Sequence, residues 1–88
     1  MELDQEQIRK WIGKGLKEAR EKKGLSQEQL AAASAIAAPS ISNYERGESF
    51  PCLYNLIRMQ EVLGFSFDTV LLGDGELFLS NDIERGQA

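Results

Sequence analysis

The chain has 88 residues, a formal net charge of −4, 42% hydrophobic residues and one cysteine. This length suits one domain with a modest core, and no apolar run approaches a membrane span. The sequence contains no histidine, which removes the commonest general base and metal ligand. We therefore expect no enzyme activity, no metal, no cofactor and no small-molecule ligand.

The N-terminus and the cysteine content favour a cytoplasmic protein. The first residues, MELDQEQ, are acidic and polar, unlike a signal peptide. Cys52 has no second cysteine to pair with, which suits a reducing compartment. It also has no histidine to activate it, so we interpret it as a structural or incidental thiol.

Basic residues are concentrated near the N-terminus. Residues 1–24 hold seven of the ten Lys and Arg residues, whereas residues 25–88 hold three, against nine acidic residues. A local positive field can attract an anionic partner in spite of a negative total. A solvated helix face is the alternative interpretation.

A first helix is predicted to begin between residues 4 and 7 and to end at Gly24. Four apolar residues recur at spacings of four, four and three, as one helical stripe requires: Ile8, Ile12, Leu16 and Ala19. Gly13 and Gly15 lower the helix propensity by roughly 1 kcal/mol each relative to alanine. Trp11 lies off the stripe, either packed against the C-terminal tail or exposed at a contact.

Two short helices follow around a tight turn. Ser26 and Gln29 form the pattern of a capping box for a helix that ends near residues 34–36. A third helix is predicted over residues 38–45, with Pro39 tolerated in its first turn. Ile41 and Tyr44 point inward from it, and Gly47 ends it.

The remaining helices are predicted over residues 53–63 and 66–72. The first buries Leu53, Leu56, Ile57 and Leu63 and stops at Gly64. The whole is an all-α, compact five-helix bundle, divided into a domain of residues 1–73 and a tail of residues 74–88.

Residues 12–73 resemble the Cro/repressor-type (XRE-like) helix-turn-helix family of bacterial and phage regulators. The segments that carry the resemblance are LKEAREKKGLSQEQLA, SISNYERG and LGFSFDTVLLG. The resemblance implies the lambda-repressor-like fold and a sequence-specific DNA-binding transcriptional regulator, a repressor that acts as a homodimer on double-stranded DNA.

The resemblance also assigns roles to individual residues. Gln27 is placed at a phosphate contact at a helix N-terminus, where free N–H groups attract anions. Arg20 and Glu45 are placed in an internal ion pair, and Phe65 and Val70 are placed in the core. The base-reading positions match Ala38, Pro39, Ser40 and Asn43, and Ser42 and Arg46 are assigned to the DNA backbone. Of these, Asn43 offers the best base contact, since its amide fits adenine with two bonds.

Four positions depart from the family pattern. Ala35 replaces the usual turn glycine, at a cost of roughly 1–2 kcal/mol if the backbone there is left-handed. Ala37 is a poor helix cap, and Gln60 stands where a small apolar residue is usual. Glu48 replaces a common basic residue, which weakens the case for tight DNA binding.

Apolar residues near the C-terminus exceed what the core needs, which indicates association. We predict that a homodimer forms through the helix over 66–72 and the tail, using Phe67, Leu72, Leu77, Phe78 and Leu79. Alternatively, the tail folds back over Trp11 and the protein is a monomer. A second function also remains open: a protein-interaction module on the same fold, such as an antitoxin or an accessory subunit.

Overall fold

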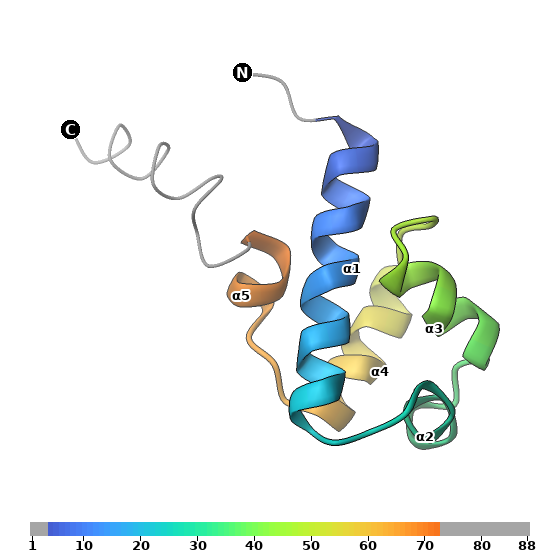
Figure 1. Cartoon of the computed structure of the whole chain (residues 1–88). Coiled ribbons are helices and arrows are strands. Elements are labelled where there is room, and N and C mark those ends of the chain that lie inside the picture. Colours follow the sequence, from blue (N-terminus) through green and yellow to red (C-terminus); the bar gives the residue numbers. More distant parts are fainter. Residues whose placement is uncertain (1–3, 73–88) are drawn as a thin grey trace.

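The structure is a computed structural model that describes residues 4–72 (Figure 1). Those residues contain helices and no strand, which confirms the all-α prediction for this part of the chain. The helices are α1 (Gln5–Lys22), α2 (Gln27–Ser34), α3 (Ala38–Glu45), α4 (Leu53–Leu63) and α5 (Phe67–Leu72). The long helix α1 packs against α3 on one side and α5 on another, and α2 packs against α3 and α4.

The core takes a fully buried side chain from every one of these helices. They are Leu16, Leu30, Ile41, Met59 and Val70. Burying a side chain of this size contributes about 1.5–3 kcal/mol, so the helices stabilise one another through a shared centre. The predicted stripe of α1 is confirmed, because Ile12 and Leu16 are buried and Ile8 and Ala19 pack against the core.

The predicted starts and stops of α2 and α3 are confirmed. The Ser26 hydroxyl accepts from the Gln29 backbone N–H at 3.0 Å, and the Gln29 side chain accepts from the Ser26 backbone N–H at 2.8 Å. Ala35 adopts a left-handed conformation with φ 60°, and the Ala37 side chain does not cap α3. The tight turn between α2 and α3 therefore forms without the residue types that favour it.

Two glycines that lower the helix propensity of α1 have a packing role instead. A Cβ atom added to Gly13 would lie 2.3 Å from the Tyr44 carbonyl oxygen, and one added to Gly15 would lie 3.1 Å from the Val70 Cα. Glycine thus lets α3 and α5 approach the backbone of α1 closely. The two glycines lower the helix propensity of α1, but a larger residue at either position would prevent this close packing.

The predicted buried face of α4 is partly wrong. Leu56 and Leu63 are buried as expected, but Leu53 is 70% exposed and Ile57 is 42% exposed, and Met59 is buried instead. Residues 56, 59 and 63 share one helix face, and Ile57 lies about 100° around the helix from Leu56. Gln60, which is half-buried, donates to the Phe65 carbonyl oxygen at 3.3 Å.

The predicted core roles of Phe65 and Val70 are confirmed, whereas the dimer contact of Phe67 stays a prediction. Val70 is buried, Phe65 packs against the core, and the partly exposed Phe67 ring meets Phe65 edge-on with centroids 5.5 Å apart. The tail residues Leu77, Phe78 and Leu79 lie outside the described residues, as does the Leu72 side chain.

Candidate nucleic-acid interface

The helices α2 and α3 pack against each other and are joined by residues 35–37. Leu30, Ile36 and Ile41 are buried around this turn. The end of α2 is also held to α4, because Arg58 Nε donates to the Ser34 carbonyl oxygen at 2.6 Å. Two short helices fixed in this way present their exposed sides as one surface.

A buried ion pair joins α3 to α1. Arg20 Nε and Nη2 donate to the two carboxylate oxygens of Glu45 at 2.7 and 3.1 Å, and Nη1 donates to the Leu25 carbonyl oxygen at 2.7 Å. The side chains are only 10% and 3% exposed. The hydrogen bond to Glu45 raises the pKa of Arg20. The ion pair implied by the sequence is thereby confirmed.

Gln27, the predicted phosphate contact, lies at the first position of α2 and is half-buried. Its Nε2 donates to Glu45 Oε1 at 2.9 Å, so its side chain extends the buried ion pair. The structure thus gives Gln27 an internal partner that the sequence did not indicate, and its phosphate contact stays a prediction.

The proposed base-reading positions differ in exposure. Pro39 is exposed, whereas Ala38, Ser40 and Asn43 are half-buried. All four lie on α3, whose inward side carries the buried Ile41 and Tyr44. Their contact with a base stays a prediction.

Ser42, Asn43 and Arg46 come together at the end of α3. Arg46 Nη1 donates to the Ser42 hydroxyl, and Nη2 donates to Asn43 Oδ1 at 2.6 Å. Arg46 Nε and Nη2 also donate to the Glu48 carboxylate at 3.1 and 3.0 Å. The mutual hydrogen bonds raise the pKa of Arg46 and lower the pKa of Glu48. We call these four residues the Arg46 cluster.

Comparison with known proteins places this arrangement in a family. The sequence model of the family described as "Helix-turn-helix" matches residues 16–70. The chain belongs to the helix-turn-helix family.

Three relatives carry the same description in their names. The HTH-type transcriptional regulator ImmR of Bacillus subtilis (strain 168) is 36% identical over 73 residues, which cover 83% of this chain and 57% of ImmR. The SPbeta prophage-derived uncharacterized HTH-type transcriptional regulator YonR of the same strain is 34% identical over 82% of this chain and 67% of YonR. The uncharacterized HTH-type transcriptional regulator y4dJ of Sinorhizobium fredii is 34% identical over 67% of this chain and 77% of its own length.

The comparisons bear on how much of its relatives this chain covers and on whether it is an enzyme. The aligned part of the chain spans little more than half of ImmR. The family and the regulator names of the relatives bear out the prediction that this chain is not an enzyme. In addition, no helix within residues 4–72 has the length and apolar character that crossing a membrane requires.

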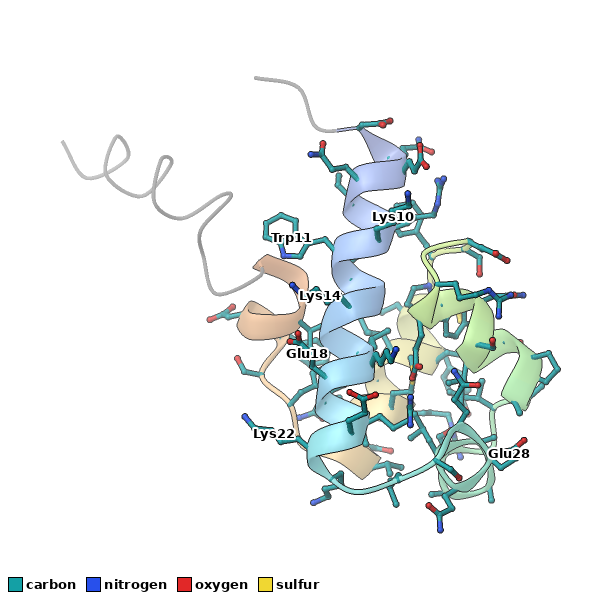
Figure 2. The ribbon with its side chains drawn as sticks, in the orientation of Figure 1. Lys10, Trp11, Lys14, Glu18, Lys22 and Glu28 are labelled. Carbon is teal, nitrogen blue, oxygen red and sulfur yellow. The ribbon has the colours of Figure 1, made fainter. Side chains whose placement is uncertain are left out.

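Basic residues of α1 lie on more than one side of the helix. Lys14 and Lys22 line a groove between α1 and α5, together with Trp11 and Glu18 (Figure 2). Arg20 is committed to the buried pair. Arg9 and Lys10 lie beside Gly47, in the loop that follows α3.

One further contact escaped the sequence interpretation. Arg9 Nε donates to the Gly47 carbonyl oxygen at 3.1 Å, and its guanidinium carbon lies 5.7 Å from the centre of the Phe50 ring. These contacts hold the loop after α3 against the start of α1. The residues are 38 positions apart, so no local pattern in the sequence indicates the contact.

Proposed function

We propose that this protein is a sequence-specific DNA-binding transcriptional regulator, a repressor that acts as a homodimer in the cytoplasm. Residues 1–73 form its five-helix DNA-binding domain, and residues 74–88 are a tail that contributes to dimerisation. The observation that carries the proposal is the α2–α3 unit, locked to α1 by the buried Arg20–Glu45 pair and contained in the helix-turn-helix match.

Helix α3 is the recognition helix, with its N-terminal part in the major groove. Asn43 and Ser40 contact base edges, and Ala38 and Pro39 contact apolar groups such as thymine methyls. Gln27, Ser42 and Arg46 contact the phosphate backbone. Phosphate contacts and DNA shape carry much of the recognition, because α3 offers few groups that form base-specific hydrogen bonds.

A homodimer supplies the second recognition helix. Two-fold related units read half-sites about 34 Å apart, one turn of the duplex. Phe67, which is partly exposed on α5, supports association at this end of the chain.

The test is selection of the full chain on random-sequence duplex DNA, repeated over a salt series. The expected result is an enriched two-fold motif, with binding that weakens steeply as salt rises. A single enriched half-site would contradict the homodimer alone. No enrichment and no binding at low salt would contradict DNA recognition.

The second candidate function is a protein-interaction module on the same fold. The observation that favours it is the set of exposed large apolar side chains on and before α4, namely Phe50, Leu53, Tyr54 and Ile57. Exposed apolar clusters of this kind mark association surfaces. The same selection discriminates the two functions, because an interaction module enriches no DNA motif.

A further inference from the structure

The side chain of Arg46 is almost fully occupied within its own chain. Arginine has five N–H donors, and the Arg46 cluster uses four of them: two on Glu48, one on Asn43 and one on Ser42. Glu48 takes the Nε edge of the guanidinium with both carboxylate oxygens, the two-bond geometry that arginine also uses for a phosphate. The carboxylate thus occupies the position that a phosphate would take.

We propose that Glu48 is an internal competitor for DNA, which holds Arg46 and must be displaced before Arg46 contacts a phosphate. The proposal rests on the proposed DNA-binding function. Sequence-independent DNA affinity comes from cations that replace the counterions of phosphates. A neutral Arg46–Glu48 pair replaces none, so Glu48 lowers the affinity for DNA of any sequence.

The Arg46–Glu48 pair is exposed to solvent, so DNA can displace Glu48 from Arg46. The Arg46 and Glu48 side chains are 53% and 58% exposed, and an exposed pair changes an equilibrium by up to about five-fold. Glu45, the preceding acidic residue, does not compete in this way, because it is buried and bonded to Arg20 and Gln27. Of these two acidic residues, it is therefore Glu48 that neutralises the positive charge of Arg46 at the surface.

The cluster also links Glu48 to the proposed base-reading residue. Arginine has donors and no acceptor, so the Asn43 atom that faces Arg46 is the amide oxygen. A two-bond fit to adenine needs that oxygen as well as the amide nitrogen. When DNA displaces Glu48, Arg46 moves to the phosphate and the Asn43 oxygen becomes available to the base.

The experiment measures binding of a labelled random-sequence duplex by fluorescence anisotropy over a salt series. Glu48→Gln is compared with the wild type and with Glu61→Gln, a matched control that removes the same charge from an exposed site on α4. We expect Glu48→Gln to raise the affinity about three- to five-fold at moderate salt. Its salt slope becomes more negative, by up to about 0.9, the value for one phosphate contact, because fewer bound complexes keep the Arg46–Glu48 pair in place of that contact.

Arg46 variants then identify the cation that Glu48 holds. In the Glu48→Gln background, Arg46→Gln removes the gain in affinity and the added salt slope. In the wild-type background, Arg46→Gln lowers the affinity by a smaller factor, because Glu48 already offsets part of the Arg46 contact. Binding by Glu48→Gln alone, with a wild type that does not bind, also supports the proposal.

Two outcomes overturn the proposal and can be told apart. If the wild type binds DNA and Glu48→Gln behaves like Glu61→Gln, Glu48 acts only through general charge, and the proposed function stands. If no variant binds any duplex at low salt while circular dichroism shows all of them helical, the proposed function fails and the competition fails with it.

Discussion

Two ion pairs meet at the end of α3, on two consecutive residues. Glu45 points inward and pairs with Arg20, whereas Arg46 points outward and pairs with Glu48. Consecutive residues of a helix lie about 100° apart around its axis, so one turn of α3 serves both the interior and the surface. The chemistry of the two pairs is alike, and burial determines what each does.

The inner pair is surrounded by further donors. Glu45 accepts from Gln27 as well as from Arg20, and Arg20 also donates to the Leu25 carbonyl oxygen. Buried charges need such additional bonds to offset their desolvation. The inner pair therefore joins α1, α2 and α3, whereas the outer pair is exposed and open to competition from water or an anion.

Loss of one inner partner is expected to give the largest effect. Glu45→Ala leaves the Arg20 guanidinium buried without its carboxylate, which lowers the free energy of unfolding by about 3–5 kcal/mol. Urea denaturation followed by circular dichroism measures this change. Glu18→Ala, at an exposed position of α1, is the control, and equal losses in the two variants would show that the inner pair does not lock the fold.

A double variant sharpens this comparison. Arg20→Met with Glu45→Leu replaces the charges by apolar groups, so it is expected to be more stable than Glu45→Ala alone. The difference in the free energy of unfolding between the two variants separates the contribution of the pair from the penalty of an unpaired buried charge. A double variant less stable than Glu45→Ala would contradict that separation.

The close approach of α3 to α1 at Gly13 is the next feature to disturb. A Cβ atom at Gly13 would lie 2.7 Å from the Glu45 carbonyl oxygen as well as against Tyr44. Gly13→Ala is therefore expected to lower the free energy of unfolding by about 2–3 kcal/mol, as overpacking does, although alanine favours helix. Thermal unfolding compares it with Lys14→Ala at the adjacent exposed position, and a more stable Gly13→Ala would mean that α3 moves away without penalty.

The two regions also differ in how far the sequence predicts them. The helix boundaries followed from local signals such as the Ser26 capping box and the three glycines that end helices. The Arg20–Glu45 pair followed from the family resemblance, because 25 residues separate its members. The sequence analysis missed the packing role of Gly13 and the Gln27–Glu45 bond. Both depend on neighbours distant in the chain, which helical periodicity does not reveal.

The sequence analysis named the residues of the Arg46 cluster, but it did not predict the hydrogen bonds that join them. The resemblance selected Ser42, Asn43 and Arg46, and it marked Glu48 only as a departure. Exposed side chains have several accessible rotamers, so the bonds that join them follow from their positions on the folded surface. The DNA contacts of these residues remain predictions, since they depend on a partner.

At the outer region, the larger effect is expected in DNA recognition and not in folding. Asn43→Ala removes a base contact, which lowers discrimination at one base position by about 1–3 kcal/mol. Competition binding against duplexes that carry each single substitution of the selected motif measures this loss. An equal loss of affinity for every DNA sequence would mean that Asn43 contacts the DNA backbone and not a base. A large fall in the free energy of unfolding would mean that Asn43 has a structural role.

The smallest expected effect concerns the acid range. Hydrogen bonding to Arg46 lowers the pKa of Glu48 in the folded protein. The pair therefore contributes stability above the pKa that Glu48 has in the unfolded chain, and this contribution is lost as the pH falls through the lowered, folded value. Carboxyl NMR should show the Glu48 midpoint rising in Arg46→Gln, with a small stability difference from wild type that disappears at low pH. If the midpoint does not move, the bonds of the outer pair do not persist in solution, and the contrast with the inner pair is then between a salt bridge and two independent charges.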